Sequence, residues 1–146
     1  MFAWRNFIET VGKVLADIDG DLMSEHGLTS GDYEVFVFLS EAPERAMRMC
    51  DLAEKLRLSP SGLTRRLDGL VKSGYVVREP CPDDRRATLA KLTDTGIAKH
   101  AAAAADHVAH VRRHLLGYLT RDELLGLGNA FVAIKAGRAS SPYESA

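Results

Sequence analysis

The fold is decided by one stretch, Arg78-Glu-Pro-Cys-Pro-Asp-Asp-Arg-Arg-Ala-Thr-Leu-Ala-Lys-Leu-Thr-Asp-Thr-Gly96. Two short β-prone runs lie on either side of a tip, which is made of Pro80, Pro82, Asp83, Asp84, Arg85 and Arg86. Proline fixes φ and supplies no N–H, so the tip residues end a strand and begin a turn and do not extend a helix. The stretch therefore predicts a short β-hairpin that holds two guanidinium groups away from the protein body.

The residues before this hairpin have the pattern of two helices joined by a tight turn. Cys50 stands at an N-cap position before a first helix of residues 51–58. Ser59 then caps, and Pro60 opens, a second helix that runs to about residue 73. The residues that this second helix should bury are Leu63, Leu67, Leu70 and Val71. A helix–turn–helix followed by an arginine-tipped hairpin predicts a winged helix, a fold that reads duplex DNA.

Helices are also predicted ahead of this module. Apolar residues recur at helical spacing through residues 3–26, which predicts one long amphipathic helix that Gly27 ends. Thr29 and Ser30 are candidate caps for a second helix, which should stop before Pro43. Residues 45–49 are expected to form a short extended link.

Two further helices should follow the hairpin. Thr93 is placed to cap a long, alanine-rich helix from residue 94 to about residue 118. Thr120 and Glu123 form a capping box for a last helix from residue 121 to about residue 135, and the tail from Gly137 is expected to fray. The predicted fold class is mainly α (α+β), a winged helix–turn–helix with helices at both ends of the chain.

Composition is typical of a soluble globular protein, with 146 residues, 46% hydrophobic and 27% charged. The length fits a single domain of residues 1–146. No apolar run approaches the roughly 18 residues that a membrane span needs, and the N-terminus lacks the layout of a signal peptide. The two cysteines, Cys50 and Cys81, make no disulfide framework. We therefore expect a cytoplasmic protein with no membrane partner.

Charge is unevenly distributed along the chain. The formal net charge is only −1, yet residues 45–91 hold eleven Lys/Arg against six Asp/Glu, while the flanking residues hold eight against fourteen. The basic excess therefore coincides with the predicted reading module, a layout that suits phosphate binding.

The helices at the two ends of the chain are amphipathic but have no core of their own to cover. The winged helix–turn–helix, residues 29–92, is too small to need them. We expect residues 1–28 and 93–140 to form dimerisation helices, so that a two-fold dimer reads a palindromic DNA site.

Four segments together resemble the multiple-antibiotic-resistance regulator (MarR) family. They are Asp51-Leu-Ala-Glu-Lys-Leu, Leu58-Ser-Pro-Ser-Gly-Leu-Thr-Arg-Arg-Leu-Asp-Gly-Leu-Val-Lys-Ser-Gly-Tyr-Val-Val-Arg78, Asp84-Arg85-Arg86 and Leu92-Thr-Asp-Thr-Gly96. The resemblance implies a homodimeric winged-helix transcription factor, usually a repressor. We expect no cofactor. It also implies that a small aromatic or phenolic ligand could release the DNA.

Candidate DNA contacts follow from this layout. The first turns of the second helix of the motif should enter the major groove, and they carry Ser59, Ser61, Gly62, Thr64, Arg65 and Arg66. Arg65 or Arg66 could pair with a guanine edge, and the sequence does not say which. A solvated helix face is the plainer interpretation of the same pair.

The resemblance also assigns roles in the wing and beside it. Arg86 matches the family residue that inserts into the minor groove, where narrow A·T-rich segments attract guanidinium groups. Asp84 resembles the family acid that orients it, although ordinary turn chemistry would also explain Asp83 and Asp84. Arg85 and Lys72 are expected to contact phosphate.

Three other groups of residues have more than one interpretation. Asp106, His110 and His114 are spaced to place a metal on one helix face, and His100 and His107 lie on the same helix, but histidines at a helix surface are common and no metal site is predicted. Cys50 and Cys81 raise the possibility of a redox switch, but peroxide-sensing relatives have their cysteine near the first helix, where this chain has none. Trp4 and Phe36 are core candidates that could also line a ligand pocket between the first, second and fifth helices.

Two classes of function remain open at this point. The favoured one is a ligand-responsive regulator that binds specific double-stranded DNA. The alternative is a winged-helix module that binds proteins and has no specific operator. An enzyme is a distant third, because no nucleophile, paired acid and base or phosphate-binding loop stands out.

Overall fold

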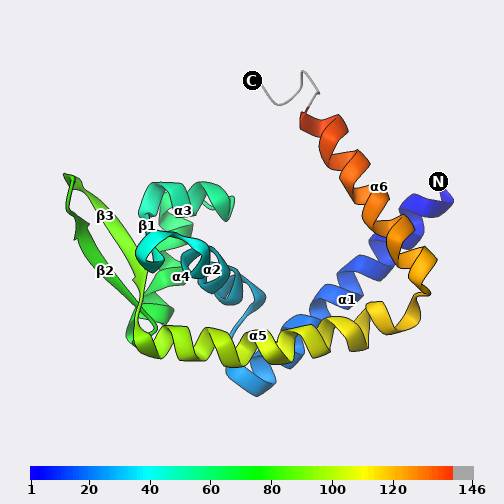
Figure 1. Ribbon diagram of the computed structural model, residues 1–146, viewed down its shortest axis with the longest axis horizontal. Helices are drawn as coiled ribbons and strands as arrows, with labels where there is room; N and C mark the ends of the chain where they lie inside the picture. The colour runs from blue at the N-terminus through cyan, green and yellow to red at the C-terminus, as the bar shows by residue number, and fades with distance from the viewer. Residues whose placement is uncertain (140–146) are drawn as a thin grey trace. The chain divides into compact units, whose positions relative to one another are not determined.

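A small three-stranded antiparallel sheet packs against several helices (Figure 1). The computed structural model describes residues 1–139. The chain forms two units, Met1–His110 and the residues from Val111 onward, and each is described here by itself.

The first unit contains most of the elements. They are α1 (Phe2–His26), α2 (Ser30–Glu41), the 3-10 helix η1 (Pro43–Arg45), β1 (Ala46–Arg48), α3 (Met49–Lys55), α4 (Pro60–Lys72), β2 (Val76–Cys81), β3 (Asp84–Leu92) and most of α5 (Asp94–His114). The second unit holds the end of α5, the 3-10 helix η2 (Leu116–Tyr118) and α6 (Arg121–Ala139).

Local signals fix most helix starts as the sequence predicts. Thr29 accepts a hydrogen bond from the Asp32 amide, and the Asp32 carboxylate accepts one from the Thr29 amide, which makes a complete capping box for α2. Ser59 caps α4 with Pro60 in its first turn, and Thr120 with Glu123 caps α6. α1 ends at Gly27, whose φ of 63° is in the left-handed region that glycine favours.

Gly96 of the segment Leu92-Thr-Asp-Thr-Gly96 is required by close packing. Thr93 accepts a hydrogen bond from the Gly96 amide at 3.0 Å, and its hydroxyl donates to the Gly74 carbonyl at 2.6 Å. A Cβ at Gly96 would overlap the Tyr75 carbonyl oxygen. The segment therefore joins the start of α5 to the start of β2.

The predicted hairpin is confirmed, and its strands β3 and β2 are the central strand and one edge strand of a three-stranded sheet in the order β1-β3-β2. Only Pro82 and Asp83 lie between the strands, so the turn is shorter than the predicted tip. Pro80 is accommodated within β2 because β2 is an edge strand, where a missing N–H is tolerated. The predicted link of residues 45–49 contains β1, which pairs with β3 through Met47 and Ala90.

Several predicted boundaries are wrong. Cys50 is not the N-cap of α3, because β1 leads directly into this helix and the cap is Arg48. The helix ends at Lys55, where Arg57 adopts a φ of 54° and the Leu58 amide donates to the Ala53 carbonyl, a C-terminal motif that usually contains glycine. The predicted continuation of α5 to residue 118 breaks at Leu115, and α6 continues through Gly137 to Ala139.

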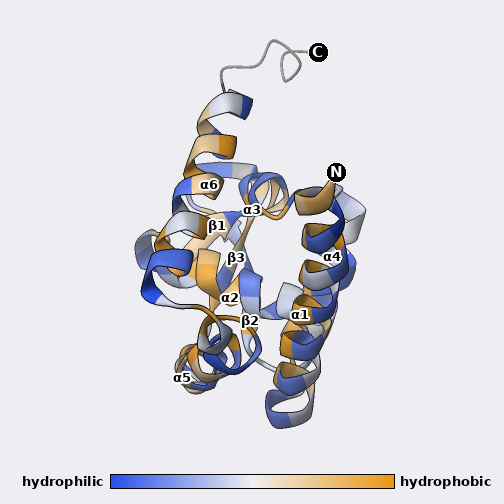
Figure 2. Ribbon diagram, turned by 90° about the vertical axis from the view of Figure 1, so that its right-hand side faces the viewer, coloured by the Kyte–Doolittle hydropathy of each residue, from blue (hydrophilic) through white to orange (hydrophobic). Residues whose placement is uncertain are grey.

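The core of the first unit lies between the sheet and helices α1 to α5. Its fully buried side chains include Leu22, Phe36, Leu39, Leu52, Leu63, Leu67 and Val76. Leu63, Leu67 and Leu70 of α4 are buried as predicted, whereas Val71 is only half-buried. Along α1, hydrophobic and hydrophilic residues form alternating bands (Figure 2). Among the described residues, no helix combines the length and apolarity that crossing a membrane requires.

Candidate nucleic-acid interface

α4 buries one face and exposes the other. Leu63, Leu67 and Leu70 pack into the core, and the exposed face carries Ser61, Thr64, Arg65, Asp68 and Lys72. These positions follow the three- and four-residue spacing of a single helix face. Ser61, Thr64 and Arg65 therefore project together from the first turns of α4, and Lys72 continues the same face to the last turn.

The start of α4 is held by its own side chains. Ser59 Oγ accepts from the Gly62 amide at 3.1 Å and lies 3.2 Å from Ser61 Oγ. The Thr64 hydroxyl donates to the Pro60 carbonyl at 2.9 Å. Of the predicted site residues, Ser59 and Gly62 thus shape the helix start, and Gly62 is half-buried.

The two adjacent arginines of α4 have different environments. Arg66 Nη1 donates to Thr29 Oγ1 at 3.3 Å and lies 3.7 Å from Asp32 Oδ1, so this half-buried side chain joins α4 to the capping box of α2. Gly31 makes room for it, because a Cβ there would overlap the guanidinium group. Arg65 is exposed and makes no hydrogen bond or ion pair with another described residue. Of the two, Arg65 is the arginine available to a ligand.

In the wing, Asp84 acts on the backbone. Its Oδ1 accepts from the Arg86 amide at 3.0 Å, which closes an Asx-type turn at the start of β3. Asp84 therefore contacts Arg86 through the main chain and not through the guanidinium group, and its role in orienting Arg86 remains a prediction. Arg86 itself is exposed, and Arg85 occupies the strand position before it.

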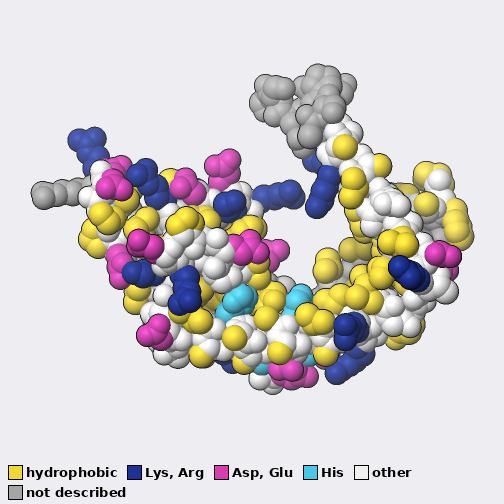
Figure 3. Space-filling view, viewed as in Figure 1, with side chains coloured by type: hydrophobic (Ala, Val, Ile, Leu, Met, Phe, Trp, Pro, Cys, Tyr) yellow, Lys and Arg dark blue, Asp and Glu magenta, His cyan; other side chains and the backbone are white. Residues whose placement is uncertain are grey.

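A groove runs between the wing and the starts of α3 and α4. Its lining includes Arg48, Thr64, Arg78 and Arg86, so three guanidinium groups from β1, β2 and β3 share one surface. Elsewhere on the winged helix, basic and acidic side chains are interspersed (Figure 3). The three-arginine groove is suited to an anionic backbone.

Arg78 is a contributor that sequence reasoning missed. Its Nη2 donates to the Asp68 carboxylate at 2.8 Å and to the Thr64 carbonyl at 3.0 Å, which ties β2 to α4. Arg78 is the last residue of the second segment that resembles the MarR family. Its partner Asp68 lies ten residues earlier in the sequence, and no local sequence pattern predicts that the two side chains meet. This contact sets the position of the wing relative to the exposed face of α4.

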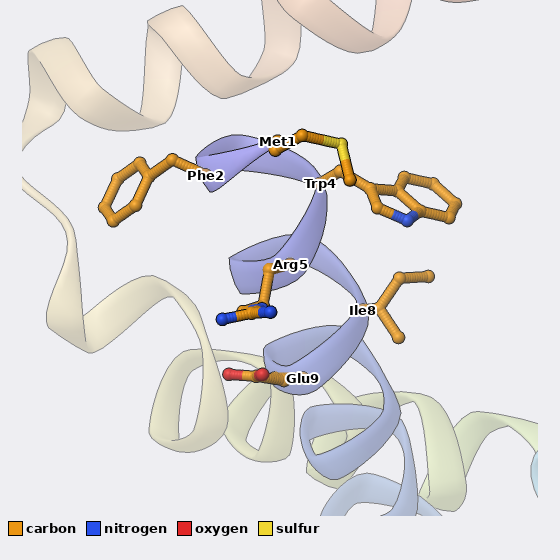
Figure 4. A pocket seen from close by; sticks show the side chains of 6 residues that line it. All are labelled: Met1, Phe2, Trp4, Arg5, Ile8 and Glu9. Atoms are coloured by element: carbon orange, nitrogen blue, oxygen red, sulfur yellow. The ribbon is translucent and has the colours of Figure 1, made fainter.

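The two predicted ligand residues do not share a pocket. Trp4 is 61% exposed near the start of α1, where its ring stacks on Phe7, and it lines an open pocket made only of residues from this end of the chain. Trp4 and Ile8 lie on one side of the helix, and Arg5 and Glu9 lie on another (Figure 4). Phe36 is completely buried, with its ring edge-on to Tyr75. The prediction that Trp4 belongs to the core is therefore wrong, and that for Phe36 is confirmed.

The histidines of α5 are not simple surface residues. His110 is only 1% exposed, and its Nε2 lies 2.9 Å from Glu25 Oε2. The His107 ring contacts Tyr33 in a tilted arrangement, with 4.6 Å between ring centroids, and burial together with the neighbouring His110 lowers the pKa of His107. Burial also lowers the pKa of His100, against an opposing influence of Glu41.

The two cysteines are in different settings. Cys50 is exposed on the first turn of α3 and lies in the three-arginine groove, with its Sγ 3.3 Å from Asp51 Oδ1. Cys81 is buried at the end of β2. A redox role for either remains a prediction.

Comparison with known proteins identifies the family. The model of the MarR family matches residues 26–87. AbsC from Streptomyces coelicolor, a MarR family transcriptional regulator, is 35% identical, with a TM-score of 0.85 over 95% of this chain and 93% of that chain. The chain belongs to the MarR family. It accordingly has the MarR winged-helix fold, which it shares with relatives described as transcriptional regulators.

Two further relatives of this MarR-family chain bear on function. Sco3205 from Streptomyces coelicolor, solved in complex with DNA, is 32% identical, with a TM-score of 0.85 over 93% of this chain and 85% of that chain. The transcriptional regulator PrsX from Escherichia coli is 29% identical over 76% of this chain. The chain spans 66% of the length of PrsX, slightly less than two thirds.

Proposed function

We propose that this MarR-family chain is a homodimeric repressor that binds a palindromic operator. α4 enters the major groove, and the wing reaches the adjacent minor groove. The observation that carries the proposal is the exposed Ser61–Thr64–Arg65 face of α4 next to the three-arginine groove. The side chains of this face are of the kinds that pair with base edges, and the groove faces the phosphate backbone.

Each proposed DNA contact has a defined chemistry. Arg65 makes the bidentate contact with guanine, and Ser61 and Thr64 contact bases or phosphate. Arg86 inserts into the minor groove from a turn that Asp84 holds. Lys72, Arg85 and Arg48 contact phosphate, and Arg66 acts indirectly by holding α4 against α2. Because the proposed target is chromosomal DNA, the protein acts in the cytoplasm.

The dimer is proposed from the exposed apolar surface of both terminal helices. Phe2 and Leu15 of α1 are exposed, as are Leu125, Val132 and Ile134 of α6, and hydrophobic side chains cover much of these helices (Figure 3). Apolar surface of this extent usually marks an interaction site. A second copy is the natural occupant, because a palindromic operator needs two reading helices about 34–36 Å apart. Residues 1–28 and 93–140 are the proposed dimerisation segments around a reading core of residues 29–92.

A small aromatic ligand is the proposed signal for release. Trp4 and Arg5 both line the open pocket at the start of α1, which would suit a phenolic acid, whereas Phe36 would have to leave the core to contact one. Such a ligand weakens DNA binding only if it prefers the conformation that cannot bind the operator. Salicylate at millimolar concentration should therefore raise the operator Kd measurably, and no change across a panel of phenolic acids would eliminate this class of effector.

Operator binding is tested with the full-length protein and a palindromic duplex from the DNA beside its own gene. The control duplex has the same length and composition, with one half-site scrambled. Fluorescence anisotropy should show two chains per palindrome and an affinity at least ~10³-fold above non-specific binding at physiological salt. Equal affinity for both duplexes would refute a specific operator and favour a module that binds proteins.

A further inference from the structure

Four side chains with metal-binding chemistry meet where the last turn of α1 contacts the middle of α5. His26 Nε2 lies 3.0 Å from Asp106 Oδ2, and His110 Nε2 lies 2.9 Å from Glu25 Oε2. One ligand atom from each of Glu25, His26 and Asp106 lies within 4.8 Å of the other two. Each helix thus supplies one carboxylate and one imidazole to the same small region.

These distances suit a divalent ion of the zinc class. Zn²⁺ binds imidazole nitrogen and carboxylate oxygen at about 2.0–2.2 Å, so three ligand atoms around one ion lie roughly 3–3.5 Å apart. The contact of His26 with Asp106 already has this spacing. The Asp106 and Glu25 side chains are about half exposed, so both can shift toward an ion, whereas His26 is held by its burial.

His110 gives an independent reason to regard the cluster as more than two surface ion pairs. It is a fully buried imidazole whose Nδ1 finds no hydrogen-bond partner among the described residues, while its Nε2 is directed at Glu25. Burying a polar nitrogen without a partner is costly, and an apolar side chain would fill the position at lower cost. Carboxylates that bind a metal are themselves usually held by a hydrogen bond from a second residue, and the contact of His110 Nε2 with Glu25 Oε2 would supply one.

We propose that Glu25, His26 and Asp106 bind one divalent transition-metal ion, with His110 as the residue that orients Glu25. This set differs from the one that the sequence spacing indicated on α5 alone, Asp106 with His110 and His114. Asp106 and His110 each pair with a different residue of α1, so the ion lies between the two helices and not on one helix face.

The position of the site suggests how an ion would act on DNA reading, a consequence that rests on the proposed function. Glu25 and His26 are followed by Gly27, by the buried Leu28 and by Thr29, which contacts Arg66 of α4. An ion that fixes the end of α1 against α5 therefore also fixes the turn that holds the reading helix.

Metal binding is tested on the full-length protein after removal of metals by a chelator, with cobalt(II) alone as the probe. The expected result is visible d–d absorption that saturates at one ion per chain and is displaced by zinc. His26→Gln and Asp106→Asn should abolish this signal, and His110→Gln should weaken binding about 10–100-fold. His114→Gln is the matched control and should bind cobalt like the wild type. Loss of cobalt binding in His114→Gln would support the set on α5 alone, Asp106 with His110 and His114, and would overturn the set proposed here.

Thermal unfolding separates ligand loss from misfolding. Zinc should raise the melting temperature of the wild type and of His114→Gln, but not of His26→Gln, whose metal-free melting curve should remain cooperative. No cobalt spectrum and no zinc-dependent shift in the wild type would overturn the site. Operator affinity with and without zinc is measured separately. Equal affinities would overturn only the coupling between metal binding and DNA binding. Absence of operator binding under both conditions would count against the proposed function and leave the metal site intact.

Discussion

The different environments of Arg65 and Arg66 predict that two neighbouring alanine substitutions have opposite consequences. Arg65 is exposed on the face of α4 that we assign to the major groove, so Arg65→Ala should remove the proposed base contact. A bidentate arginine–guanine pair is worth ~1–3 kcal/mol of discrimination, which corresponds to about a 5- to 150-fold increase in operator Kd. Stability should change by no more than ~0.5 kcal/mol, because no intramolecular hydrogen bond or ion pair with a described residue is lost.

Arg66→Ala should have the reverse pattern. The lost hydrogen bond to Thr29 is worth ~0.5–1.5 kcal/mol. The ion pair with Asp32 at 3.7 Å adds at most ~1 kcal/mol, because both side chains are partly solvated. The free energy of unfolding should fall by ~1–2 kcal/mol, with a fall in melting temperature of about 2–4 °C per kcal/mol. The ratio of specific to non-specific affinity should remain close to that of the wild type.

The assay combines thermal unfolding with fluorescence anisotropy on the palindromic and scrambled duplexes at one fixed salt concentration. Lys72→Ala is the matched control for a phosphate contact: it should weaken binding to both duplexes and reduce the salt slope by about one. If Arg66→Ala abolished the preference for the palindrome while Arg65→Ala preserved it, the assignment of the reading face would be wrong.

Three other predictions concern the wing, the assembly and pH. Asp84→Ala should weaken operator binding although it removes a negative charge. Asp84→Asn keeps an acceptor for the Arg86 amide and should bind the operator nearly as well as the wild type. Tighter binding by both variants in the anisotropy assay would show that only the charge of Asp84 matters. Val132→Glu should convert the proposed dimer to monomer at micromolar concentration in light scattering, with Lys135→Glu as a control that stays dimeric, and a monomeric wild type would refute the dimer. Burial keeps the pKa of His107 below its ordinary value of 6.5. As the pH falls, His107 therefore takes up a proton more readily in the unfolded chain than in the folded one, so the stability that is present above pH 6.5 is lost below it. Urea denaturation measures the unfolding free energy, and its decrease between pH 7.5 and pH 5.5 should be smaller in His107→Gln than in the wild type. Equal decreases in the two proteins would contradict the assignment of this pH dependence to His107.

The parts of the fold that the sequence predicts well are those fixed by neighbouring residues. Ser59 with Pro60, and Thr120 with Glu123, mark helix starts because capping uses a side chain and an amide only two or three positions apart. The hairpin is predictable for the same reason, since proline restricts its own backbone. Helix ends are harder: α3 stops at a left-handed Arg57, a residue type that gives no warning of this conformation.

The features that the sequence does not predict depend on contacts between distant segments. β1 exists because β3, more than forty residues later, supplies its hydrogen bonds. The burial of His110 follows from its contact with Glu25, 85 positions away, and the spacing of histidines along α5 carries no trace of it. The family resemblance supplied roles for the wing, but the route by which Asp84 acts became visible only with its hydrogen bond to the backbone.

The contact of Arg66 with the α2 capping box suggests why the arginine pair of α4 divides its roles. The reading helix α4 must be held at a fixed angle to present Arg65. Arg66, at the adjacent position, holds α4 to the start of α2 through its hydrogen bond with Thr29, which lies 37 residues earlier in the chain. Thr29 also begins α2 directly after the turn that follows α1, and the next amide, that of Ser30, donates to Asp19 of α1 at 2.6 Å. Hydrogen bonds, and not only the apolar core, therefore connect the last turns of α1 to α4, and we expect a displacement of α1 to reach α4 through them. Regulation of DNA binding then requires no change in the reading face itself, because a ligand that alters this turn changes the angle at which an unaltered Arg65 is presented.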